Sequence, residues 1–103
     1  MRKNRVLIID HDLQTCKDIK YNVDSEMTDE YYTLTVREGL TELASKEYDL
    51  VILNACFPEN DGMELLKTLR DLKPMPILIL STSSALADKL EAFKVGADDY
   101  LTK

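Results

Sequence analysis

The sequence predicts an α/β fold in which a parallel sheet carries helices on both faces. Three short, unbroken apolar runs, over 5–10, 49–53 and 77–80, are typical of strands that are buried on both sides. Between them, apolar residues recur at intervals of three and four, as they do in amphipathic helices. Strands that alternate with helices form right-handed crossovers, which make a parallel sheet. We interpret the 103 residues as one domain.

The first half of the chain adds two helices and a second strand to this pattern. The spacing of apolar residues predicts a helix over 13–23, which Asp12 can cap. The acidic segment 24–30 predicts a loop, and the aromatic and β-branched residues at 31–36 predict a strand. A short helix over 39–46 then leads to the third strand.

The second half repeats the alternation. A loop after the third strand precedes a helix over 63–72, and two prolines flank the way into the fourth strand. A helix over 85–95, which Ser83 and Ser84 can cap, ends before a glycine. Residues 100–101 then form a short fifth strand.

Composition excludes several classes of function. The net charge of −6 and the pI near 4.7 argue against binding nucleic acid, which relies on clustered basic residues. No apolar run approaches the roughly 20 residues of a membrane span, so we expect a cytoplasmic protein with no membrane contact. Cys16 and Cys56 lie far apart in a chain with one histidine, which indicates reduced thiols instead of a zinc site or disulfide framework.

Polar residues follow the predicted strands. In an open parallel α/β sheet, ligands bind at the carboxyl ends of the strands, so residues there are candidates for chemistry. The residues at these positions are Asp10, His11, Asp12, Asn54, Ser81, Thr82 and, at the end of the last strand, Lys103.

Two motifs identify a family. The turn PENDG at 58–62 and the segment GADDYLTK at 96–103 resemble those of response regulator receiver domains, and the resemblance covers Val6 to Lys103. It implies a flavodoxin-like, doubly wound sheet of five strands in the order 2-1-3-4-5, flanked by five helices. The chain stops at Lys103, so we expect a receiver domain truncated before the fifth helix.

The resemblance also implies a role for each strand-end residue. In the family, a carboxylate after the third strand, four residues before a proline, accepts a phosphoryl group, and here that position is Asn54. The remaining positions correspond to the acidic pocket and metal site (Asp10, His11, Asp12, Cys56), the phosphate contacts (Ser81, Thr82, Lys103) and the conformational switch (Ser81, Tyr100).

Two substitutions fall on this chemistry. The amide of Asn54 lacks the nucleophilic carboxylate, so we expect no ordinary aspartyl phosphorylation, unless the asparagine is an engineered change in a normal receiver. His11 replaces a second acid, and magnesium prefers hard oxygen ligands, so we expect weak magnesium binding or none. His11 could instead hold zinc or nickel with Asp10 and Asp12, or form a catalytic triad with Asp10 and Ser81.

We therefore expect a non-enzymatic receiver that works through protein contacts. Its partners would be a sensor histidine kinase or another signalling protein and an attached DNA-binding output domain. A homodimer, with a second copy bound to an uncovered sheet face, is a further alternative. The alternative is a flavodoxin-like domain that binds a small molecule. That alternative lacks support because none of the three glycines belongs to a glycine-rich phosphate loop.

Overall fold

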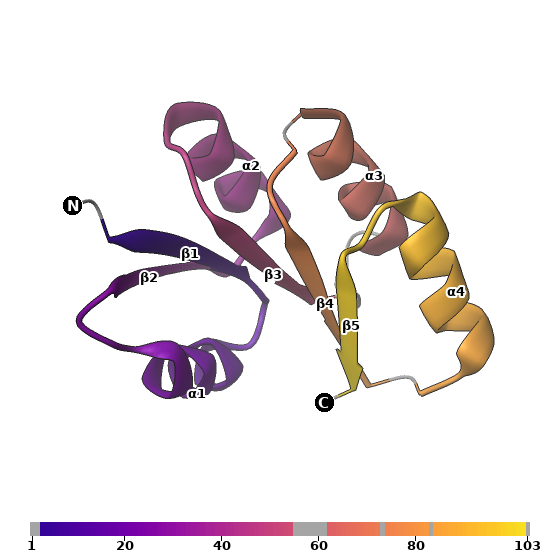
Figure 1. Ribbon diagram of the computed structural model, residues 1–103, viewed down its shortest axis with the longest axis horizontal. Coiled ribbons are helices and arrows are strands. Elements are labelled where there is room, and N and C mark those ends of the chain that lie inside the picture. Colours follow the sequence, from indigo (N-terminus) through magenta and orange to yellow (C-terminus); the bar gives the residue numbers. More distant parts are fainter. Residues whose placement is uncertain (1–2, 55–61, 73, 83, 103) are drawn as a thin grey trace.

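A five-stranded parallel sheet with the order β2-β1-β3-β4-β5 forms the centre of the domain, as predicted (Figure 1). The computed structural model describes residues 3–54, 62–72, 74–82 and 84–102. Within these ranges, no helix is long and apolar enough to span a bilayer. The elements are β1 (Asn4–Ile9), α1 (Leu13–Val23), β2 (Thr28–Thr33), α2 (Val36–Ser45), β3 (Leu50–Asn54), α3 (Gly62–Leu72), β4 (Ile77–Ser81), α4 (Leu86–Val95) and β5 (Asp99–Thr102).

Each face of the sheet carries its own apolar layer. Helices α2, α3 and α4 cover one face, and α1 lies on the other (Figure 1). Successive residues of a strand point to opposite faces, so Leu7 and Ile9 of β1 enter the larger layer while Ile8 enters the smaller one. Cys16 of α1 is completely buried in the smaller layer. The apolar runs of β1 and β3 are thus buried on both sides, which explains why they do not alternate with polar residues.

The face that carries α1 is only partly covered. Leu78 and Leu80 of β4 are half-buried, and Leu101 of β5 is 50% exposed. Among the described residues, α1 is the one helix on this face, and it packs beside β1 and β2. In the described part of the chain, an apolar strip over β4 and β5 is therefore partly exposed.

The predicted second strand and second helix are each displaced. β2 begins at Thr28, inside the segment predicted as a loop, because an edge strand half exposed to solvent does not need an apolar run. α2 begins at Val36, a residue we had placed in the strand. Thr35 starts this helix with a capping box: its Oγ1 accepts from the Glu38 N–H and donates to Glu38 Oε1, both at 3.1 Å.

Helix α4 differs from its prediction in its cap, and its apolar stripe faces away from the sheet. Ala85 is the N-cap residue, without a side-chain hydrogen bond, so the predicted cap at Ser84 is wrong, and Ser83 lies outside the described residues. Leu86, Leu90 and Phe93 are 69%, 59% and 46% exposed. This apolar stripe faces solvent, while the small Ala92 packs against the sheet.

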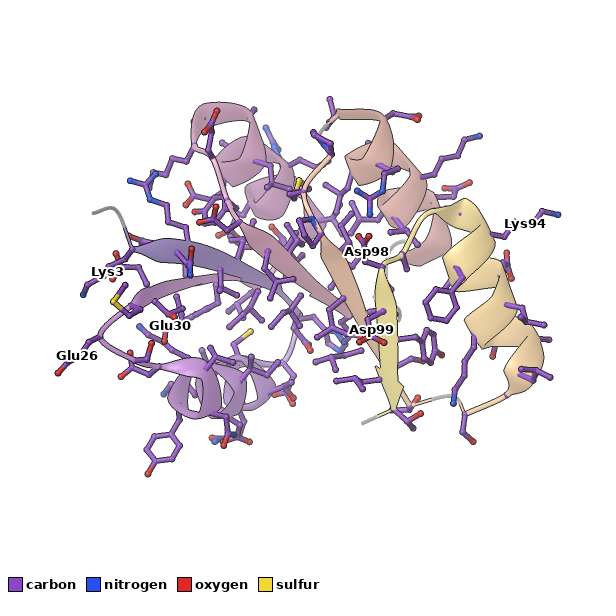
Figure 2. The ribbon with its side chains drawn as sticks, viewed as in Figure 1. Lys3, Glu26, Glu30, Lys94, Asp98 and Asp99 are labelled. Carbon is purple, nitrogen blue, oxygen red and sulfur yellow. The ribbon has the colours of Figure 1, made fainter. Side chains whose placement is uncertain are left out.

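An arginine on α3 joins the loop before β4 to the loop after α4. Arg70 donates to the carbonyls of Met75, at 2.7 Å, and Gly96, and its Nη2 lies 2.6 Å from Asp98 Oδ2. Asp98 lies where the chain enters β5, and it also accepts from the Ile77 N–H at 2.8 Å (Figure 2). That N–H, together with the Arg70 guanidinium, lowers the pKa of the Asp98 carboxyl against the opposing effect of burial. These contacts hold β5 next to β4.

Candidate functional site

Three buried polar residues converge at the carboxyl edge of the sheet. Strands β1, β3 and β4 run in register, so Asp10 directly follows β1 while Asn54 and Ser81 are the last residues of β3 and β4. Asp10, Asn54 and Ser81 are only 1%, 3% and 2% exposed. Buried polar groups need hydrogen-bond partners, so contacts at this edge determine its chemistry.

Asp10 is the acceptor at the centre of this cluster. Its Oδ1 accepts from Asn54 Nδ2 at 3.0 Å and from the backbone N–H of Asp12 at 2.9 Å. The Sγ of Cys16 donates to the Asp10 carbonyl at 3.5 Å, which anchors α1 beneath the site. Two N–H donors thus solvate a carboxylate oxygen that is out of reach of water.

His11 lies at the mouth of the site. Its side chain is 42% exposed, and its Nδ1 lies 3.7 Å from Asp10 Oδ1 and 3.4 Å from Asn54 Nδ2. The imidazole therefore borders the Asp10–Asn54 contact from the solvent side.

Asp12 serves as the cap of α1, as predicted. Its Oδ1 accepts from the Gln14 N–H at 3.1 Å, and its Oδ2 accepts from Thr15 Oγ1 at 2.7 Å. Both oxygens thus accept hydrogen bonds from the first turn of the helix. Within the described ranges, no three His, Cys, Asp or Glu side chains form a group that could hold a metal ion, so the zinc or nickel alternative lacks a ligand set.

The described residues do not fit a magnesium ion either. Magnesium takes hard oxygen ligands in a near-octahedral arrangement. Asn54 instead directs an N–H donor at Asp10 Oδ1, and His11 offers a nitrogen. Among the described residues at this point, Asp10 contributes the carboxylate that does not cap a helix. Cys56, which we assigned to the same pocket, lies outside the described residues.

Of the predicted phosphate-contact and switch residues, Ser81 lies on β4 and Tyr100 on β5. Ser81 ends β4 in a buried position, and Thr82 follows it in an exposed one. Tyr100 is 7% exposed and belongs to the larger apolar layer, with the Lys89 ammonium 5.9 Å from its ring centroid. Its ring is thus turned into the domain. Lys103 and most of the turn over 58–62 lie outside the described residues.

Comparison with known sequences agrees with the motif-based resemblance. Residues 6–103 match the family profile of the response regulator receiver domain. The chain is 40% identical over 100 residues to the cell cycle transcriptional regulator CtrA of Caulobacter vibrioides, and 33% identical over 98 residues to the KDP operon transcriptional regulatory protein KdpE of Escherichia coli. These alignments cover 96% and 95% of this chain but 43% and 44% of the two regulators.

Solved structures share the fold over almost the whole chain. The receiver domain of the Francisella response regulator 1452 aligns with a TM-score of 0.90 and 32% identity, covering 98% of this chain and 84% of that one. A two-component response regulator from Clostridium difficile aligns with a TM-score of 0.93 and 28% identity, with the same coverage. Asp10, Asn54 and Ser81 lie within the range that the family profile matches.

Proposed function

This chain belongs to the response regulator receiver domain family. We propose that it signals through protein contacts, as a receiver does, but without phosphorylation at Asn54, the residue at the end of its third strand. The observation that carries the proposal is the 3.0 Å hydrogen bond from Asn54 Nδ2 to Asp10 Oδ1. An amide has no carboxylate oxygen with which to attack a phosphoryl donor, so it cannot form an acyl phosphate.

The electrostatics of the site favour the same conclusion. Two carboxylates this close in a buried site repel each other, and a cation is needed to keep both ionised. With asparagine at position 54, the amide N–H donates a hydrogen bond to the Asp10 oxygen, and no second negative charge is present. Asp10 Oδ1 is therefore satisfied without a metal ion or a phosphate.

The position of Tyr100 supports a signalling state that does not depend on phosphate. In the mechanism that the family resemblance implies, the aromatic residue at this position turns inward when the domain is activated. Tyr100 is already buried, with its ring in the apolar layer formed with α4. The surface formed by α4 and β5 would then keep one conformation whether or not phosphate is present. Binding of a partner protein would regulate the output instead.

Partners form the second part of the proposal. We infer contact with a sensor histidine kinase or another signalling protein, and an attached output domain that controls transcription. The chain spans less than half of CtrA and KdpE, both named as transcriptional regulators. Any DNA contact would belong to that output domain, because this one carries a net charge of −6.

Acetyl phosphate tests the proposal directly. The chain and its Asn54→Asp variant are incubated with acetyl phosphate and magnesium, and their intact masses are measured. We expect the mass of one phosphoryl group on the variant alone, which would assign the block to Asn54. If neither protein is modified, His11 also disables the site, and the phosphate-independent role stands. Phosphoryl transfer to the unchanged chain would refute the proposal.

A further inference from the structure

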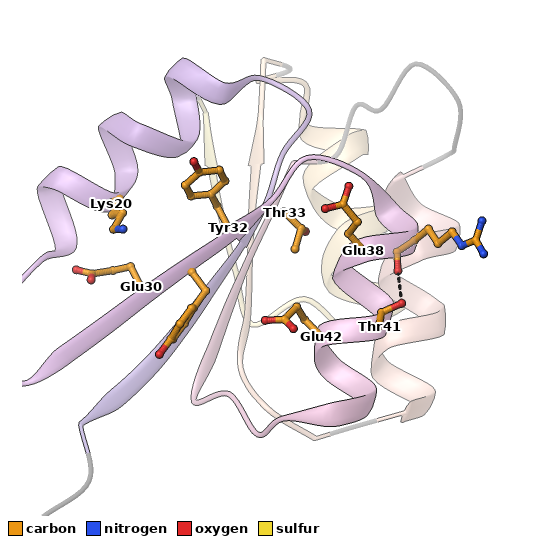
Figure 3. A pocket seen from close by; sticks show the side chains of 9 residues that line it. Lys20, Glu30, Tyr32, Thr33, Glu38, Thr41 and Glu42 are labelled. Atoms are coloured by element: carbon orange, nitrogen blue, oxygen red, sulfur yellow. Dashed lines mark hydrogen bonds between the residues drawn. The ribbon is translucent and has the colours of Figure 1, made fainter.

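A cavity of about 560 Å³ lies at the outer edge of the sheet, away from the Asp10–Asn54 site. Residues from α1, β2 and α2 line it, and Figure 3 shows their side chains. Those that matter most to the argument are Lys20, Glu30, Tyr32, Thr33, Thr41 and Glu42.

The cavity extends across the free edge of β2. Glu30 and Tyr32 lie on the side of α1, whereas Thr33 lies on the side of α2 (Figure 3). Side chains of a strand alternate between the two faces of the sheet. A single cavity lined by side chains from both faces must therefore extend around the strand edge. β2 is the outermost strand, and no described strand pairs with this edge.

The main chain of β2 offers outward-facing hydrogen-bonding groups there, of which the Glu30 N–H also bonds the Glu30 carboxylate. The carbonyls of Met27 and Thr33 accept from the N–H groups of Asn4 and Asp10, at 2.9 and 3.2 Å. The main-chain groups of the odd-numbered residues of β2 therefore face β1. Because the direction alternates along a parallel ladder, the N–H and C=O groups of Glu30 and Tyr32 point outward, toward the cavity. An extended chain could pair with them.

Glu30 is the chemically unusual residue of the cavity. It is only 8% exposed, yet its Oε1 has no hydrogen-bond partner among the described residues. Burial, reinforced by the neighbouring carboxyl of Asp24, raises the pKa of Glu30. A buried carboxylate oxygen without a partner is costly, and a ligand that supplies a cation would remove that cost. The Thr33 hydroxyl, also buried, lacks a partner in the same way.

The other acids of the lining already have partners. Glu42 accepts from Tyr48 Oη at 2.8 Å, and Glu38 accepts from the Thr35 hydroxyl. Glu30 lies beside Asp24 and Lys20, but it is the lining acid with a buried oxygen, Oε1, that lacks a hydrogen bond among the described residues. Beside it, the Tyr32 ring is 37% exposed and offers an aromatic face to a guanidinium or ammonium group.

We propose that this cavity binds an extended, basic segment of a partner protein, which adds to β2 as a further strand and places a lysine or arginine side chain against Glu30. Main-chain pairing supplies affinity, and the buried carboxylate selects a positive charge. The inference goes beyond the proposed function and does not depend on whether Asn54 blocks phosphorylation.

A synthetic peptide tests the proposal. The probe is a blocked peptide of alternating arginine and valine, about seven residues long to match a strand, titrated into the ¹⁵N-labelled chain. We expect saturable shifts of the Glu30 and Tyr32 amide signals. Glu30→Gln should weaken binding by about tenfold, the effect of losing one charge-assisted hydrogen bond. Glu26→Gln, a change at an exposed acid outside the cavity, should leave affinity unchanged.

Two further probes separate strand addition from simple charge attraction. A version of the peptide with N-methylated amides keeps its charge but cannot pair with an edge strand, so we expect it not to bind. Free arginine should bind far more weakly than the peptide. The proposal is overturned if the N-methylated peptide or free arginine binds as tightly as the original, or if Glu30→Gln, verified as folded by its melting temperature, binds unchanged. Shifts scattered over all acidic surfaces would also overturn it.

Discussion

The side-chain nitrogen of Asn54 lies 3.0 Å from a carboxylate oxygen of Asp10, and both residues are almost completely buried. The contact joins the ends of β1 and β3 through a neutral donor. A carboxylate at position 54 would reverse the sign of this interaction, because two acids would then share the same small volume. The stability of the sheet edge is therefore coupled to the residue at this one position.

We expect Asn54→Asp to lower the free energy of unfolding by about 1–3 kcal/mol in EDTA, since it removes a buried hydrogen bond and adds like charge. Millimolar magnesium should restore part of this loss in the variant and leave the unchanged chain unaffected. Chemical denaturation with and without magnesium measures both effects. Asn4→Asp adds the same charge at an exposed position and is the control. Equal stability of the Asn54→Asp variant and the unchanged chain in EDTA would contradict the prediction.

Arg70→Met should destabilise the domain by about 1–3 kcal/mol, because the carbonyls of Met75 and Gly96 and the carboxylate of Asp98 lose a charged donor. Methionine keeps the aliphatic packing of the arginine stem. Urea denaturation measures the difference. Lys67→Met, an exposed position on the same helix, should change stability by less than about 0.5 kcal/mol. A similar loss in both variants would show that the contacts of Arg70 with Met75, Gly96 and Asp98, which we call the Arg70 clamp, add no specific stability.

The same clamp should make stability depend on acid pH. The folded state lowers the pKa of Asp98 from its usual 3.8, mainly through the Ile77 N–H. The ionised carboxylate thus stabilises the fold above the pKa of the unfolded chain, and this contribution disappears as the pH falls through the lower, folded pKa. Asp98→Asn should therefore be less stable than the unchanged chain at neutral pH, and the gap should close below about pH 4. A gap that is constant down to pH 2 would argue against it.

The sequence predicts elements best where burial leaves a clear pattern. The run over 49–53 became β3 almost residue for residue, and Asp12 caps α1 as expected. The predicted position of β2 is wrong because its first three residues, 28–30, are polar, as an edge strand permits. The beginning of α2 was missed even though Thr35 and Glu38 have the spacing of a capping box, a signal that could have located it.

At the site, too, the sequence predicts some features and not others. Strand ends placed Asp10, Asn54 and Ser81 at one edge, since a parallel register brings them together. The direction of the Asn54 hydrogen bond depends on three-dimensional contacts that no spacing encodes. Arg70 and Glu30 could not be identified either, because in sequence they are ordinary charged residues of a helix and a presumed loop. Their importance arises from burial and from partners that are distant along the chain.

Helix α2 approaches β1 so closely that Gly39 has no room for a side chain. A Cβ at this position would lie 2.7 Å from Ile9 Cδ1. We expect Gly39→Ala to cost about 1–3 kcal/mol, as overpacking of a core does. Adding Ile9→Val removes the crowding methyl group, so the double variant should be more stable than the sum of the single changes predicts. Thermal and urea denaturation of all four proteins complete the cycle, and strictly additive effects would contradict the steric explanation.

The uncovered strip on β4 and β5 should make this chain self-associate. Leu80 and Leu101 are paired neighbours on that face, and Leu101 is half exposed. A second copy could bury both strips, and burying one leucine contributes about 1.5–3 kcal/mol. Leu101→Gln should therefore weaken dimerisation by at least about tenfold in size-exclusion chromatography with light scattering. Leu72→Gln is the matched control, because Leu72 is 58% exposed at the end of α3. A chain that stays monomeric at every concentration, or that responds equally to both changes, would show that this strip does not mediate association.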